Sequence, residues 1–96
     1  MLFRSLVARA ALPPEIDRAH LLDQLKQREH LGSTYVGDGV AFPHPSSADT
    51  CGVTKPIVCI ATPRKPILWG DGPDIDGAPR AEIIVLLLAQ IGRAHV

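Results

Sequence analysis

The sequence predicts a small α/β domain, and two kinds of apolar patterning lead to this prediction. Near the N-terminus, apolar residues recur at spacings of three and four, which is typical of amphipathic helices. Later in the chain, compact apolar runs alternate with clusters of Gly, Pro and Asp, which is typical of buried strands joined by turns. The length of 96 residues leaves room for one such domain and not two.

Two helices are expected in the first third of the chain. Pro13 and Pro14 end the first helix, because proline disfavours helical continuation; its apolar stripe is Leu2, Phe3, Leu6, Val7 and Ala10. Asp17 is expected to cap a second helix that runs from residue 18 to about 29, with Gly32 as its C-terminal stop. The expected buried face of that helix is Leu21, Leu22 and Leu25, and the expected solvent face is Asp23, Gln24, Lys26 and Gln27.

About three strands are expected after the helices. A turn at 37–39 precedes a short strand at 40–42, which ends at Pro43. The apolar run at 57–61 predicts a central strand. The run at 81–89 is almost wholly apolar, so it predicts a strand buried on both faces.

The connecting segments are expected to be exposed loops. Residues 45–52 are small and polar, and residues 70–79 are rich in Gly, Asp and Pro. No segment obviously covers the second face of the strand at 81–89, so residues 1–90 are expected to be a partial domain. Residues 91–96 match the in-frame translation of a sequencing adapter, and we expect a non-native read-through tail there; a natural basic tail is the alternative.

The composition argues against several classes of protein. Ten basic residues balance ten acidic ones, so the chain has no overall field for nucleic acid or an anionic membrane. The run at 83–89 is far shorter than the roughly 20 apolar residues that span a bilayer. Cys51 and Cys59, without a signal segment, indicate reduced thiols and a cytoplasmic protein. Neither a nucleic-acid partner nor membrane insertion is expected.

The candidate functional residue is His44, which stands where a strand meets a loop. The ring of Pro43 fixes the backbone just before it, and rigid strand ends commonly present functional side chains. An ordinary histidine has a pKa of about 6.5, so above pH 7 it is largely a neutral nucleophile. Arg28 can donate two hydrogen bonds to a phosphate, and Ser33 and Thr34 can add more. These residue types allow His44 to act as a phosphoryl acceptor, but from the residues alone a structural or merely exposed histidine stays open.

Two sequence patterns resemble a known family. Arg-Glu-x-Leu-Gly-Ser-Thr, followed by Gly-x-Gly-Val-Ala-x-Pro-His, is similar to the signature of fructose/mannitol-type enzyme IIA domains of the bacterial phosphotransferase system. The similarity covers roughly residues 12–90, and parts of it resemble the nitrogen-regulatory branch. It implies a small mixed β-sheet flanked by helices, with the C-terminal part of that fold missing here.

The resemblance also implies an activity. It implies that a histidine phosphocarrier protein phosphorylates His44, that Arg28 contacts the phosphoryl group, and that the group passes to a IIB domain for sugar uptake. The alternative that it implies is a regulatory module, which signals to a target protein through binding or through its phosphorylation state. No cofactor is implied by either role.

Three departures from the family pattern stand out. Pro45 occupies a position where glycine is typical, and proline has no backbone N–H. The loop at 69–77 is longer than the usual equivalent, and the helix that carries a second active-site histidine in the family has no counterpart here.

No metal is expected. A zinc set of His44, Cys51 and Cys59 fits no compact motif and lacks a fourth ligand. The acidic residues of the 70–79 loop lack the register of a calcium loop.

Overall fold

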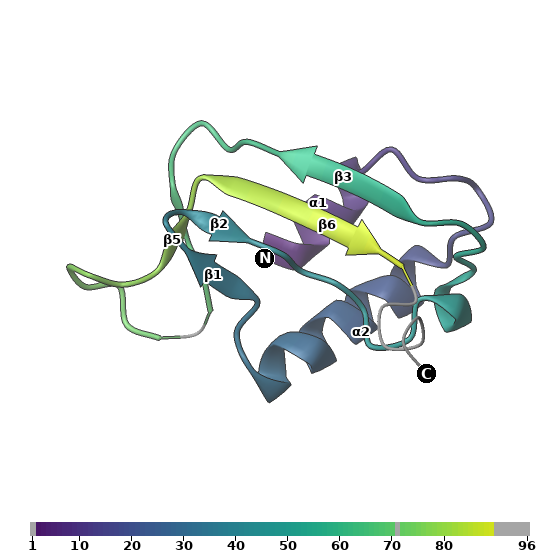
Figure 1. The fold of residues 1–96 in the computed structure, drawn as a ribbon, viewed down its shortest axis with the longest axis horizontal. Helices are drawn as coiled ribbons and strands as arrows, with labels where there is room; N and C mark the ends of the chain where they lie inside the picture. Colours follow the sequence, from purple (N-terminus) through teal and green to yellow (C-terminus); the bar gives the residue numbers. More distant parts are fainter. Residues whose placement is uncertain (1, 71, 90–96) are drawn as a thin grey trace.

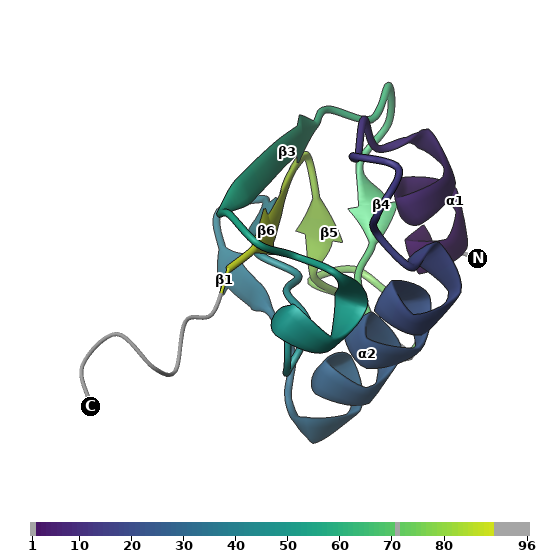
Figure 2. The ribbon, with the colours of Figure 1, turned by 90° about the vertical axis from the view of Figure 1, so that its right-hand side faces the viewer.

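The structure is a computed structural model that describes residues 2–70 and 72–89. Two helices lie on one side of a four-stranded sheet (Figures 1 and 2). The two helices are α1 (Leu2–Arg9) and α2 (Arg18–Leu31), and a short 3₁₀-helix, η1 (Asp49–Cys51), follows later in the chain. The strands are β1 (Tyr35–Gly37), β2 (Val40–Ala41), β3 (Ile57–Ala61), β4 (Ile67–Leu68), β5 (Arg80–Ala81) and β6 (Ile83–Leu88).

Both predicted helices are confirmed. The carboxylate of Asp17 accepts a hydrogen bond from the backbone N–H of His20 at 3.0 Å, which is the predicted N-cap of α2. Helix α2 runs two residues past the expected end at 29, to Leu31. Gly32 is its C-cap, with an extended φ of 166° in place of the left-handed conformation usual for a terminal glycine. None of the described helices is long and apolar enough to cross a membrane.

The main sheet is mixed, in the order β1-β2-β6-β3. Strand β6 pairs parallel with β2 and antiparallel with β3, so β6 is an inner strand and β3 lies at the edge of the described sheet. The prediction that 57–61 forms a strand is confirmed, but its central place is wrong. Strand order depends on pairing between distant segments, which a local apolar run does not encode. Strands β4 and β5 form a separate pair, which the sequence did not predict.

Strand β6 is buried on one face and partly open on the other. Its alternate residues Ile84, Leu86 and Leu88 belong to the core, whereas Ile83 is exposed and the remaining two residues are half-buried. The prediction that this strand is buried on both faces is therefore wrong for the described part of the chain. Both helices cover the same face, as Figure 2 shows, and that asymmetry explains the alternation.

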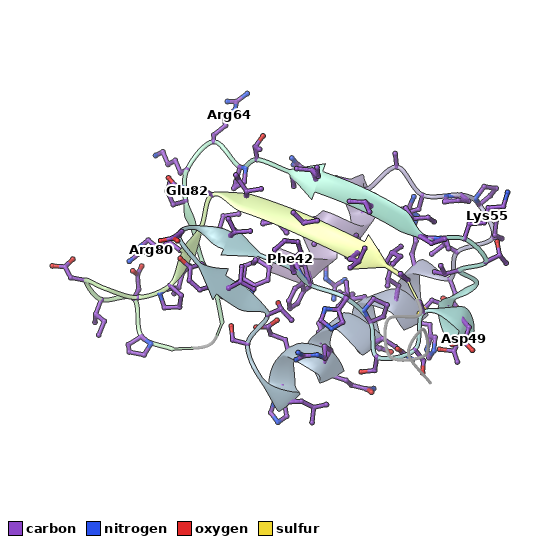
Figure 3. All side chains as sticks on the ribbon, viewed as in Figure 1. Phe42, Asp49, Lys55, Arg64, Arg80 and Glu82 are labelled. Carbon is purple, nitrogen blue, oxygen red and sulfur yellow. The ribbon has the colours of Figure 1, made fainter. Side chains whose placement is uncertain are left out.

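The segment 45–52 is not the exposed loop that its composition predicts. Pro45, Ala48 and Cys51 are buried, and Cys51 belongs to η1. The backbone N–H of Asp17 donates to the carbonyl of Cys51 at 2.9 Å, which ties the segment to the start of α2. Its residues are small enough to pack closely against the helix, so a polar-looking segment becomes part of the core. Figure 3 labels Asp49 within it, at the opposite end of the sheet from Arg80.

Trp69 anchors the connection between β4 and β5 on the core. Its ring is almost fully buried and meets Phe3 edge to face, with the ring centroids 5.5 Å apart. Its backbone N–H donates to the carbonyl of Pro79 at 2.9 Å, which closes the long loop.

Candidate functional site

His44 follows a strand end that is fixed by two backbone hydrogen bonds. Phe42 donates its N–H to the carbonyl of Thr34 at 2.9 Å, and Pro43 accepts from the N–H of Leu87 at 3.0 Å. The first bond joins the strand end to the segment after α2, and the second joins it to β6. Figure 3 shows Phe42 next to this strand end. The backbone that enters His44 is thus held rigidly, as the sequence predicted from Pro43.

The imidazole of His44 has one defined partner. Its Nδ1 lies 2.9 Å from the carbonyl oxygen of Phe42. A carbonyl can only accept, so this hydrogen bond assigns the proton to Nδ1 and leaves the lone pair on Nε2. The side chain is half-buried. With the proton on Nδ1, Nε2 is the ring nitrogen whose lone pair is not used in this hydrogen bond.

Arg28 is placed at the C-terminal end of α2, as predicted, but its described contact is with its own helix. The guanidinium donates to the carbonyl of Gly32 at 2.7 Å and so caps the helix end. A guanidinium has five N–H donors, so this bond leaves most of them available to another acceptor. Its contact with a phosphoryl group stays a prediction.

Ser33 and Thr34 have different surroundings. Thr34 is only 5% exposed, and its hydroxyl donates to Oε1 of Glu29 at 2.6 Å. The hydroxyl oxygen of exposed Ser33 accepts from the N–H of Tyr35 at 3.1 Å, and its own proton can still be donated. Thr34 thus has a structural partner, while Ser33 keeps a donor. The phosphate contacts expected of both residues stay predictions.

Glu29 is a structural hub that the sequence reasoning missed. Its carboxylate accepts from the hydroxyl and the N–H of Thr34, and from Nε1 of Trp69 at 3.0 Å. These bonds hold the end of α2, the start of β1 and the long β4–β5 connection together. The only sequence signal for it is its place beside Arg28 in the Arg-Glu-x-Leu-Gly-Ser-Thr pattern.

Gln24 and His20 also make contacts that the sequence did not predict. The helical pattern placed Gln24 on the solvent face, but its Oε1 accepts from the N–H of Ser47 at 2.7 Å. His20 is half-buried, and its Nε2 lies 3.0 Å from the hydroxyl of Thr50. Both residues face the 45–52 segment. Because that segment was predicted to be exposed, no partner for α2 was expected there.

The alternative metal sites do not assemble from the described residues. Within 2–70 and 72–89, no group of three or more His, Cys, Asp or Glu side chains is arranged to hold a metal ion. His44, Cys51 and Cys59 therefore do not form a zinc set. Asp74 pairs with Arg80, which Figure 3 labels.

Comparison with known proteins gives consistent matches. A family model described as "Phosphoenolpyruvate-dependent sugar phosphotransferase system, EIIA 2" matches residues 2–96. A nitrogen regulatory protein from Pseudomonas aeruginosa is 36% identical over 86 residues, which are 90% of this chain and 51% of that protein. The EIIABC component of a 2-O-alpha-mannosyl-D-glycerate-specific PTS system from Escherichia coli K12 is 32% identical over 78 residues, 81% of this chain and 11% of that protein.

A solved structure agrees with these matches. The crystal structure of the nitrogen regulatory protein IIA-Ntr from Neisseria meningitidis superposes with a TM-score of 0.63 at 28% identity, covering 90% of this chain and 54% of that one. The chain thus spans about half the length of the two regulatory proteins. The tail predicted at 91–96 lies outside the described residues. With its small α/β fold and its match over 2–96, the chain belongs to the EIIA type-2 family of the phosphoenolpyruvate-dependent sugar phosphotransferase system.

Proposed function

We propose that the protein is a phosphoryl carrier that accepts a phosphoryl group on Nε2 of His44 from a histidine phosphocarrier protein. The observation that carries this proposal is the 2.9 Å hydrogen bond between Nδ1 of His44 and the carbonyl of Phe42. It holds the ring and leaves the Nε2 lone pair free for in-line attack. Membership of the EIIA family supports the same chemistry.

The transfer needs little beyond positioning and charge. The N–P bond of the donor breaks as the Nε2–P bond of His44 forms, and no proton has to leave His44. The phosphorylated ring gains positive charge at Nδ1–H, and the carbonyl of Phe42 stabilises that charge. Arg28 and Ser33 are the proposed donors to the phosphoryl oxygens. Thr34 can join them only by giving up the hydrogen bond that its hydroxyl donates to Glu29. No cofactor takes part in this scheme.

Pro45 shapes this site. Because proline has no N–H, the residue after His44 cannot donate a backbone hydrogen bond to the phosphoryl group. In this proposal, side chains must therefore stabilise the charge of the phosphoryl oxygens, and Arg28 contributes most. In this proposal the carrier works in the cytoplasm and passes its phosphoryl group to a IIB domain.

A labelling experiment tests the assignment. The chain is incubated with phosphoenolpyruvate, enzyme I and the phosphocarrier, and one acid-labile phosphate per chain is expected. His44→Ala is expected to take no label, whereas His30→Ala, at an exposed position on α2, is expected to take as much as the wild type. Label that persists in His44→Ala rules out His44 as the acceptor.

A regulatory role is the second candidate. The 36% identity to a nitrogen regulatory protein and the superposition with IIA-Ntr favour it. Both roles begin with phosphorylation at His44 and differ in the next step. Transfer of the label to a IIB domain supports sugar uptake, and stable phosphohistidine with no transfer to any IIB domain of the same organism supports the regulatory role.

A further inference from the structure

The loop after His44 is bound to helix α2 by the side chain of Gln24. Ser47 donates its N–H to Oε1 of Gln24 at 2.7 Å, and the amide nitrogen of Gln24 donates to the hydroxyl of Thr50 at 3.0 Å. That hydroxyl in turn donates to the carbonyl of Ser47 at 2.8 Å. The three bonds close a ring through two side chains and the backbone of Ser47. They fix the loop backbone at this residue on both its N–H and its carbonyl.

The chemistry of the ring defines how the Gln24 amide is turned. The N–H of Ser47 requires an oxygen acceptor, so Oε1 must face it and the NH₂ group must face the other way. That NH₂ group then meets the hydroxyl of Thr50 at 3.0 Å and Nε2 of His20 at 3.3 Å. A side chain without both an acceptor and a donor cannot close this ring.

The ring lies close to His44 along the chain. Ser47 is three residues beyond His44, and buried Pro45 between them has a fixed φ. On the other side of His44, Pro43 is bound to Leu87 of β6 at 3.0 Å. The backbone through His44 is therefore anchored to β6 before the histidine and to α2 after it.

We propose that Gln24 is a positioning residue for phosphoryl transfer at His44, an inference that rests on the proposed function. Phosphoryl transfer requires the acceptor nitrogen to be in line with the breaking bond, and a misplacement of about 1 Å can cost a hundredfold in rate. Gln24 acts through Ser47 and the loop, not on the phosphoryl group. Its loss lowers the maximal rate of His44 phosphorylation and leaves the binding of the phosphocarrier unchanged.

A pair of matched variants tests this role. Gln24→Met keeps the length of the side chain and removes the ring, while Gln27→Met makes the same change on the exposed side of the same helix. We expect Gln24→Met to lower kcat for phosphorylation by the phosphocarrier about tenfold with KM unchanged. Gln27→Met leaves both constants at the wild-type values. In nitrogen NMR, the fraction of His44 rings that carry the proton on Nδ1 is expected to be smaller in Gln24→Met than in the wild type or in Gln27→Met.

If Gln24→Met does not fold, a second variant tests the positioning role of the same hydrogen-bonded ring. Thr50→Val, at an exposed position, removes two of the three bonds without changing α2 and is expected to lower kcat about threefold. The inference is overturned if the folded variants of Gln24 and Thr50 phosphorylate at the wild-type rate. A wild-type chain that takes no label on His44 overturns the proposed function itself, which is evident before any variant is compared.

Discussion

Arg28 caps α2 through the carbonyl of Gly32, and the same guanidinium is the proposed contact of the phosphoryl group. Arg28→Ala removes a charge-assisted contact worth about 1.5–3 kcal/mol in the transition state, so the transfer rate should fall roughly ten- to a hundredfold. Loss of the cap should cost only about 0.5–1 kcal/mol of stability. Arg28→Lys keeps the charge but not the two-pronged donation, and its transfer rate should be intermediate. Rapid-quench transfer and thermal melts measure both effects; an unchanged transfer rate in Arg28→Ala contradicts its phosphate contact.

Cys51 gives the fold a dependence on alkaline pH. Burial raises the pKa of its thiol above the ordinary value of 9.0; a hydrogen bond with Thr50 opposes this, and the charges of Asp17 and Asp49 add to it. In the unfolded chain the thiol ionises at its ordinary pKa while the folded thiol stays protonated. The free energy of unfolding should therefore fall as the pH rises above 9.0.

Urea titrations below and above pH 9.0 measure this decrease in the free energy of unfolding, and the decrease is expected to be smaller in Cys51→Ala. Thiol reagents should modify half-buried Cys59 faster than Cys51 in the folded protein. Equal modification rates would show that the buried thiol is accessible.

The helices were predictable because their signals are local. Asp17, the prolines before it and the leucine spacing of α2 all lie within one stretch of chain, and the structure confirms them. Strand β1 was missed because it is three residues long and ends at Gly37, too short for any period to show. The inner place of β6 depends on its pairing with β2, which is distant in sequence. The contact of Gln24 with Ser47 could not be predicted for the same reason, because the two residues are distant in sequence and meet only when the 45–52 segment packs against α2.

Gly52 is where the 45–52 segment packs most closely against the backbone before α2. Its φ is +89°, and a Cβ there would lie 2.5 Å from the backbone carbonyl oxygen of Glu15. Gly52→Ala therefore combines a strained backbone with a clash against main-chain atoms, and we expect a loss of about 3 kcal/mol or more. Gly70→Ala is the matched control, because its φ is +93° and it has open space around the Cβ position.

That control should lose only about 1–2 kcal/mol. Chemical denaturation of both variants separates the backbone strain from the close approach. Equal losses would mean that the contact with Glu15 relaxes without cost.

At the scale of the whole molecule, the sheet face away from the helices is open among the described residues. Val58 and Ile60 of β3 are 55% and 68% exposed, and they pair with Leu87 and Val85 of β6 on the same face. Exposed Ile83 and Phe42 extend this apolar area toward β2. The apolar run at 81–89 predicted burial on both faces, but among the described residues the helices cover only one of them. Single exposed apolar residues are ordinary, but a continuous apolar sheet face promotes association.

We therefore expect the 96-residue chain to self-associate through this face in a concentration-dependent way. Ile60→Lys places a charge on an exposed edge strand, so it should shift the population toward monomer in analytical ultracentrifugation and weaken binding of an apolar dye. Because the Ile60 side chain is mostly exposed and packs little against the core, Ile60→Lys should change the free energy of unfolding by no more than about 0.5 kcal/mol. Leu86→Ala, on the buried face of β6, should instead cost about 2–5 kcal/mol and leave association through the open face intact. If Ile60→Lys destabilises the fold as much as Leu86→Ala does, the open face is packed in solution and the association must arise elsewhere.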